Sequence, residues 1–179
     1  MITRFLLTLV ISLLLANTAF AQRDYLTPQE VDLVKEAQIL DKRIDVFIRA
    51  AERRLIVING SAAANAKQLK KDSERWGELP TGSRAELVSD IARIVDAAID
   101  NIDNVSEHDE RNPLIAKSLR KLATSVNSIM AQLKPLSAQA KTDAEISGFE
   151  QLNEGVQSIM EAVTKLPPEV EKKAKKDKN

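Results

Sequence analysis

The sequence lacks cysteine and has few aromatic residues. With no cysteine among its 179 residues, it can form neither a disulfide nor a thiolate metal site. It has one tryptophan, one tyrosine and four phenylalanines, although ligand pockets are commonly lined by aromatic side chains. It also has no glycine-rich phosphate loop and only one histidine, so no Glu-x-x-His pair is available for a di-metal bundle. These absences argue against a cofactor, and we predict none.

The sequence also lacks an excess of charge of one sign. It has 26 lysines and arginines against 26 aspartates and glutamates, a formal net charge of zero. Nucleic-acid-binding proteins need a basic surface to neutralise phosphates. We therefore expect no nucleic-acid partner.

The first 21 residues have the pattern of a secretory signal peptide. Arg4 is followed by an apolar run over residues 5–16, and Ala19-Phe20-Ala21 is a small-x-small cleavage site before Gln22. The run is shorter than the roughly 20 residues that a membrane span needs. We therefore expect cleavage and a periplasmic or secreted protein. The alternative is an uncleaved anchor, which would be the only membrane contact.

The stretch from Asp41 to Ile58 is the predicted central helix. Leu40, Ile44, Phe47, Ala51, Leu55 and Ile58 are spaced by three or four residues, which places them on one helix face. The last turn, residues 55–58, is apolar on every side. We therefore expect other helices to surround that turn.

Further helices are marked by their start and stop signals. Capping boxes begin at Thr27, Ser83 and Thr142, and Asn112-Pro113 has the same cap-then-proline logic. Bends or breaks are expected at residues 39–41, at Asn59-Gly60, between Gly77 and Gly82, and near Pro135. The alanine-rich segment 61–71 either continues the central helix or follows a break at Gly60.

The apolar stripes predict an all-α, antiparallel helical bundle of about four long helices plus a short N-terminal one. Ile115, Leu119, Leu122, Val126, Ile129 and Leu133 form the cleanest heptad stripe, typical of a coiled-coil seam. The bundle domain is expected to span residues 22–166. Residues 167–179, which include five lysines and three acidic residues, are expected to be a disordered charged tail.

Two groups of residues are the candidates for metal or cofactor chemistry. His108, predicted in the polar connection 106–111, stands near Asp103 and Asp109, and Asp96, Asp100 and Asp103 form an acidic stripe on a helix. His108 with Met130 or Met160 is an arithmetically possible pair of haem ligands. We interpret the histidine as a solvated loop residue, the stripe as a solvated face and the methionines as core packing. No catalytic, cofactor-binding or metal residue is predicted.

The polar side of the central helix is predicted to be basic. It has Lys42, Arg43, Arg49, Arg53 and Arg54, which could meet anionic lipid or an acidic partner. The favoured interpretation is pairing within the chain, with Glu30, Asp32, Glu52 and the acidic stripe. Trp76, just before the break at Gly77, is expected to cover the end of the bundle.

Several segments resemble known proteins. Residues 25–30, 41–44, 53–55, 101–114 and 119–122 are similar to uncharacterised secreted helical proteins of bacteria, a group that implies no activity. A weaker resemblance, to small periplasmic chaperones of the Spy and CpxP type, rests on Leu26-Thr27-Pro28-Gln29-Glu30. Their Leu-Thr-x-x-Gln motif has glutamine where this chain has Glu30, and here the motif occurs once rather than twice.

We therefore predict an exported, non-enzymatic helical-bundle protein that acts through contact with another protein. A homodimer is compatible with the heptad stripe, which suits an internal seam and a dimer seam equally. Two alternatives stay open. One is a chaperone or stress sensor that binds unfolded clients. The other is a weak metal- or cofactor-binding bundle that uses Asp96, Asp100, Asp103 and His108.

Overall fold

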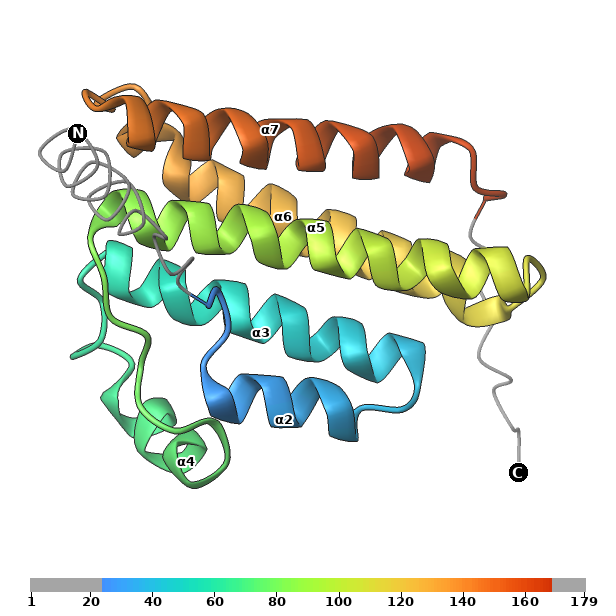
Figure 1. Ribbon diagram of the computed structural model, residues 1–179, viewed down its shortest axis with the longest axis horizontal. Helices are drawn as coiled ribbons and strands as arrows, with labels where there is room; N and C mark the ends of the chain where they lie inside the picture. Colours follow the sequence, from blue (N-terminus) through green and yellow to red (C-terminus); the bar gives the residue numbers. More distant parts are fainter. Residues whose placement is uncertain (1–23, 169–179) are drawn as a thin grey trace, which may run out of the picture.

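The computed structural model describes residues 24–168, and every regular element in that range is an α-helix (Figure 1). The helices are α2 (Pro28–Glu36), α3 (Leu40–Ile58), α4 (Ala66–Trp76), α5 (Arg84–His108), α6 (Pro113–Ser137) and α7 (Asp143–Thr164). This confirms the predicted all-α bundle. The expected signal peptide and the tail from Glu169 onward lie outside the described residues.

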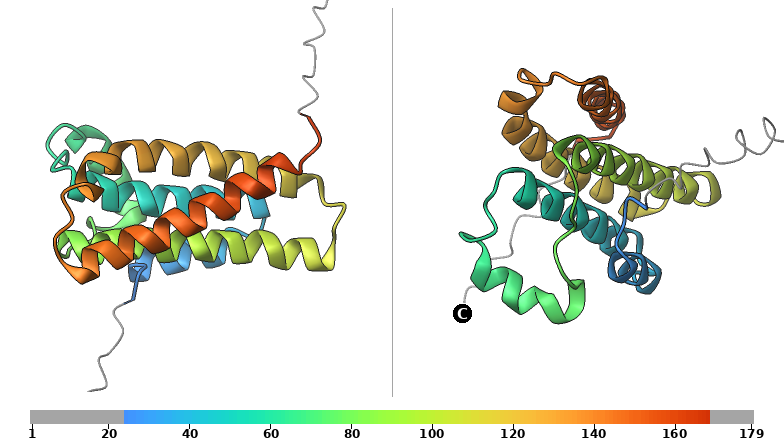
Figure 2. Two further views of the ribbon diagram at one scale, coloured as in Figure 1. Left: turned by 90° about the horizontal axis from the view of Figure 1, so that it is seen from above. Right: turned by 60° about the vertical axis from the view of Figure 1, so that its left-hand side comes forward.

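The four long helices α3, α5, α6 and α7 form the bundle, and successive ones alternate in direction (Figure 1). In space α5 and α6 each lie between α3 and α7 (Figure 2). Two neighbouring pairs are therefore parallel. Asp41 in the first turn of α3 contacts Lys117 of α6, and Asn59, the C-cap residue of α3, contacts Gln132 of α6, so the order is the same along both helices.

The other parallel pair, α5 and α7, is in extensive contact, and two α7 glycines face α5. A Cβ atom added to Gly148 would lie 3.4 Å from the backbone nitrogen of Ser89. One added to Gly155, two turns later, would lie 3.2 Å from Val95 Cγ1. A Cβ atom at Gly148 would make only an ordinary contact, whereas one at Gly155 would be crowded.

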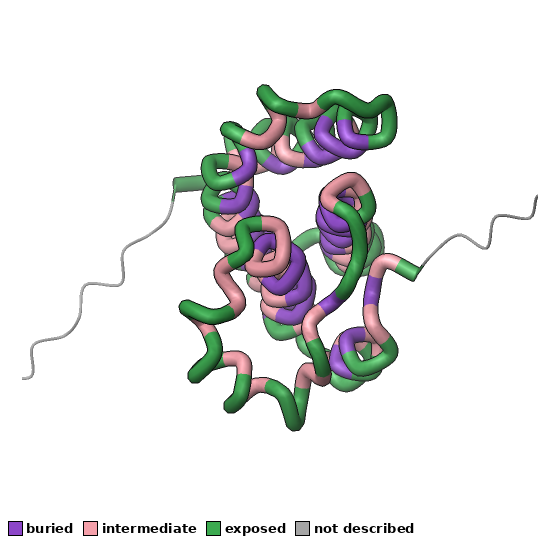
Figure 3. Tube along the Cα trace, turned by 90° about the vertical axis from the view of Figure 1, so that its left-hand side faces the viewer, coloured by how far each residue is buried: buried purple, intermediate pink, exposed green. Residues whose placement is uncertain are grey.

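The core lies between the apolar faces of the four long helices (Figure 3). The heptad stripe of α6 is buried from Leu119 to Leu133, as its spacing predicts. The expectation for the last turn of α3 is wrong: Leu55 is buried, but Ile56, Val57 and Ile58 are only half-buried. The reason is that the chain leaves α3 at Gly60 and forms α4 beside α2, so α4 does not cover that turn (Figure 1).

Most boundaries follow the predicted caps and breaks. The boxes at Thr27 and Ser83 are complete, and Asn112 Oδ1 accepts from the backbone N–H of Leu114. The third box is incomplete, because Glu145 accepts from the N–H of Lys141 rather than from that of Thr142. Gly60, with φ 61°, separates α3 from α4, so the alanine-rich segment does not continue the central helix.

Two helix ends lie beyond their predicted positions. α5 runs to His108, so this residue is helical and not part of the connection; no glycine or proline in the preceding residues stops the helix. α6 passes through Pro135 and ends at Ser137, because a proline in the last turn removes only one backbone donor. None of the described helices has the length and apolar character needed to cross a membrane.

Candidate functional site

Four charged side chains are buried together where α2, α3 and α5 meet. We call them the arginine cluster: Glu30 of α2, Arg53 and Arg54 of α3, and Asp90 of α5. Each is at most 3% exposed. Charged groups are almost never this deeply buried unless they are paired, so the contacts of the cluster decide whether the fold tolerates it.

Glu30 is the common counter-ion of the two arginines. Its Oε1 accepts from Arg54 Nη1 at 2.7 Å and from Arg53 Nε at 3.3 Å, and its Oε2 accepts from the backbone N–H of Thr27 at 2.9 Å. The glutamate that completes the first capping box therefore also neutralises buried positive charge. Sequence reasoning found the capping role and the pairing of Glu30 with the arginines, but missed that these side chains are buried.

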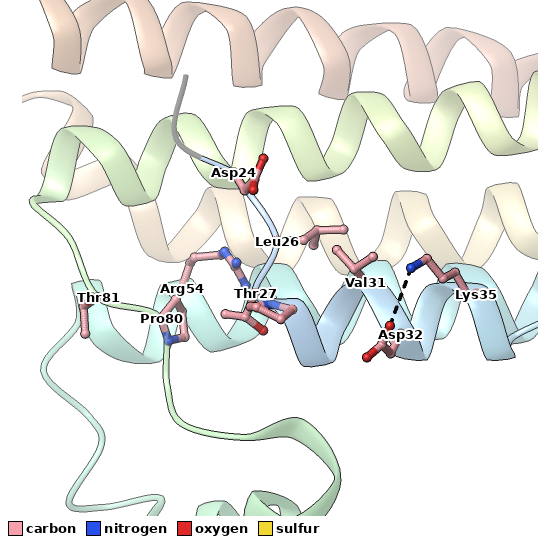
Figure 4. Close-up of a pocket in the computed structure, with 10 residues that line it drawn as sticks. Asp24, Leu26, Thr27, Val31, Asp32, Lys35, Arg54, Pro80 and Thr81 are labelled. Carbon is pink, nitrogen blue, oxygen red and sulfur yellow. Dashed lines mark ion pairs between the residues drawn. The ribbon is translucent and has the colours of Figure 1, made fainter. Parts of the chain in front are cut away.

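From its place in α3, Arg54 contacts α2, the segment that precedes α2, and α5. It donates to the backbone oxygens of Tyr25 at 2.6 Å and Ala50 at 2.9 Å, and its Nε lies 3.9 Å from Asp90 Oδ2. Figure 4 shows it extending from α3 toward the segment that leads into α2. A pocket of about 570 Å³ opens beside it, and its rim residues Asp32 and Lys35 pair with each other at 3.6 Å.

Arg53 holds the end of α4. Its Nη2 donates to the backbone oxygens of Trp76 at 3.1 Å, Gly77 at 3.2 Å and Glu78, and its guanidinium lies 5.7 Å from the centre of the Trp76 ring. Burial lowers the pKa of Arg53 below its ordinary value, against the opposing effect of the Glu30 charge. The arginine thus supplies donors to the last carbonyl group of α4 and to the two carbonyl groups that follow it.

The rest of α4 is attached mainly by polar contacts. Asp72 accepts from Arg49 Nη2 at 2.6 Å, and no residue of α4 is buried. Trp76, half-buried, lies against the side of α3, so the expectation that it covers the bundle end is wrong. The helix propensity of this segment specifies a helix, but its composition gives it no large apolar face to bury.

The structure shows which acidic residues pair with some of the basic residues of the central helix, α3. Pairing within the chain is confirmed for Arg53 and Arg54 with Glu30, and for Arg49 with Glu52 at 3.2 Å. The placement of Arg53 and Arg54 on the polar side is wrong, because both are buried. The acidic stripe does not pair with these arginines. Arg43 instead donates to the amide oxygen of Asn101 at 3.0 Å.

A second ion network joins α3 to α6. Buried Asp41 accepts from Lys117 at 2.7 Å and from Lys121 at 3.3 Å, and Lys121 also contacts Asp45 at 2.7 Å. The hydrogen bond from Lys117, assisted by Lys121, lowers the pKa of Asp41 against the opposing effect of burial. Burial alone would lower the pKa of Lys121, but the hydrogen bonds to Asp45 and Asp41 outweigh it and raise that pKa.

The metal and cofactor candidates are not brought together. Asp96 accepts from Gln151 at 2.8 Å, whereas Asp100 and Asp103 are exposed on α5. Nδ1 of His108 lies 2.7 Å from the backbone oxygen of Asn104. Between residues 24 and 168, no three or more histidine, aspartate or glutamate side chains are placed to hold a metal ion.

The methionines differ from each other in exposure. Met130 is half-buried and packs against the core, whereas Met160 is 37% exposed, so the expectation of core packing is wrong for Met160. A methionine on an outward position of α7 cannot reach the interior of the bundle.

A groove lies between the corner where α2 turns into α3 and the last turn of α4. We call it the corner groove; its volume is about 540 Å³, and its apolar lining includes Ile39, Val46 and Trp76. Ile39 is 56% exposed, more than any other large apolar side chain in the described part of the chain. Ile39 is also the N-cap residue of α3 and makes no capping hydrogen bond.

The rim of the corner groove carries charges of both signs. Glu36 is the last residue of α2, and Arg75 lies in the last turn of α4. Neither side chain forms a hydrogen bond or an ion pair with any residue in the described range. The groove therefore combines exposed apolar surface with two opposite, unpaired charges.

Comparison with protein-family models, with curated proteins and with solved structures gives no match for this chain.

Proposed function

We propose that the chain is an exported, non-enzymatic helical-bundle protein that acts through contact with another protein. The observation that supports this is the corner groove, where the apolar side chain of Ile39 and two unpaired rim charges stand open to solvent. Exposed apolar surface with a polar rim is typical of sites for protein contact. The signal-peptide pattern of residues 1–21 supports export to the periplasm or beyond.

The buried charges support a structural rather than a catalytic role for the arginine cluster. A nucleophile or a general base must reach a substrate. Glu30, Arg53 and Arg54 instead contact one another and the backbone, and each is at most 1% exposed. The cluster therefore serves to hold the groove walls in place.

Crosslinking in the native envelope tests this proposal. The tagged protein is crosslinked in intact cells, and the captured chains are identified by mass spectrometry. One dominant partner is the expected result. Specific turnover of a hydrolase or transferase substrate by the purified protein would contradict the non-enzymatic role.

A chaperone that binds unfolded clients is the second candidate. The open apolar lining of the corner groove and the Leu-Thr motif at residues 26–27 favour it. This role predicts capture of many unrelated exported proteins, and suppression of client aggregation at stoichiometric ratio. A protein that leaves aggregation of a model client unchanged is not such a chaperone.

A further inference from the structure

The corner groove keeps an apolar residue at a position where folding alone favours a polar one. Ile39 has the extended backbone of an N-cap residue, with φ −89° and ψ 129°, and its side chain caps nothing. Serine, threonine, aspartate and asparagine are the residues that stabilise this position. Ile39 neither caps the helix nor enters the core, so its side chain is available for a contact outside the chain.

The walls of the groove determine which structure can enter it. They come from α2, α3 and α4, so the groove offers no strand edge to which an extended peptide could add. A groove between helices is the kind of site into which an amphipathic helix places its apolar side chains. The volume of about 540 Å³ is that of a pocket for a few side chains, whereas a stable interface between folded domains needs roughly 20–30 residues on each side. The occupant is therefore a short segment.

The unpaired rim charges set the charge pattern of the occupant. Arg75 on the α4 wall favours an acidic residue of the ligand, and Glu36 on the α2 wall favours a basic one. Lys42 adds to the positive side, because its distance of 3.9 Å from Asp45 leaves it only weakly paired. A ligand with its charges reversed would meet like charges at both walls.

We propose that the corner groove binds a short amphipathic helix of a partner protein through apolar anchors that pack on Ile39, Val46 and Trp76. An acidic residue beside the anchors pairs with Arg75, and a basic residue on the opposite flank pairs with Glu36. This inference rests on the proposed role in protein contact and assigns that contact to one surface.

The probe is a displayed library of random peptides about four helical turns long, selected on the purified protein. Binding is measured through Trp76, the only tryptophan of the chain, whose half-buried ring lines the groove. The expected selection is peptides with apolar residues three or four positions apart, an acid on one flank and a base on the other.

Matched variants identify the surface. Ile39→Ser removes the anchor contact and supplies a helix cap, so it folds at least as stably as the wild type and weakens binding by at least about tenfold. Arg75→Glu weakens the same peptides, and replacing their acid with lysine restores binding to this variant. Met160→Ser, on the far helix α7, leaves binding unchanged (Figure 1).

Three results would overturn the proposal. They are a library that yields no binder, binders that Ile39→Ser and Arg75→Glu do not affect, and a groove filled by a second copy. In the last case sedimentation would show a dimer that Ile39→Ser dissociates. A partner captured in cells that crosslinks away from the groove would leave the proposed function standing and remove only this inference.

Discussion

At the scale of single residues, Glu30 is the shared counter-ion of two buried arginines. We expect Glu30→Gln to lower the free energy of unfolding by about 3–5 kcal/mol, because it leaves two buried arginines with one fewer counter-charge. Glutamine can still complete a capping box, so the loss reports the buried pairing and not the cap. Chemical denaturation measures it.

Glu86 provides the matched control. It occupies the same place in the capping box of α5, where it accepts from the backbone N–H of Ser83 at 2.7 Å, but it is exposed. Glu86→Gln should change the free energy of unfolding by less than about 1 kcal/mol. Equal losses for the two variants would show that Glu30 acts as a cap alone.

Asp41 makes a pH-dependent contribution. Its pKa in the folded protein is lowered, with the hydrogen bond from Lys117 as the largest cause, so its ionised form stabilises the fold above the ordinary value of 3.8. That contribution is lost as the pH falls through the lowered pKa. We expect Asp41→Asn to destabilise the protein near neutral pH and to approach the wild-type stability in strong acid.

Thermal unfolding of both proteins across the acidic range measures this effect. Asp100→Asn, on the exposed side of α5, is the control and should follow the wild-type curve. A constant difference between Asp41→Asn and the wild type at all pH values would contradict the role of Asp41 ionisation.

At the scale of elements, α4 should open more easily than the long helices. Since no residue of α4 is buried, its attachment depends on Arg53 and on the contact between Arg49 and Asp72. Asp72→Asn should speed amide hydrogen exchange across residues 66–76 by about 2- to 5-fold, the equivalent of about 0.5–1 kcal/mol for a partly exposed pair. Exchange in α5 should not change. Uniform acceleration in both helices would mean that α4 unfolds only with the whole bundle.

The two glycines of α7, Gly148 and Gly155, differ in how closely they approach α5. Gly155→Leu should cost about 1–3 kcal/mol, because even a Cβ atom there lies 3.2 Å from Val95. Gly148→Ala meets only ordinary contacts at 3.4 Å and gains helix propensity of up to about 1 kcal/mol. Denaturation curves that show similar losses for both variants would contradict this difference.

The helices could be predicted from the sequence because their signals are local. Thr27, Ser83 and Asn112 start helices through their own side chains, and Gly60 ends one through its backbone. The arginine cluster is not local, since Glu30 and Arg54 are 24 residues apart. The spacing within α3 did indicate that Arg54 is buried. Arg54 follows Ala50 and Ala51 by four and three residues, which places it on the same helix face as these two core residues.

At the scale of the whole molecule, the order of helices in space could not be predicted. Short connections join α5 to α6 and α6 to α7, yet α5 packs most extensively against α7. Gly148 and Gly155 of α7 lie at this contact, and apolar periodicity does not encode how closely two helices pack. The arginine cluster then adds α2 and α4 to the outside of the bundle and thereby forms the corner groove.

The central claim is that the molecule works through protein contact at the corner groove. The most direct measurement is site-specific photocrosslinking in the native envelope, with the photoreactive residue at Gln38 in the groove or at Met160 on α7. We predict a discrete crosslinked partner from position 38 and none from position 160. Crosslinks from position 160 alone, or equal crosslinks from both positions, would contradict the account.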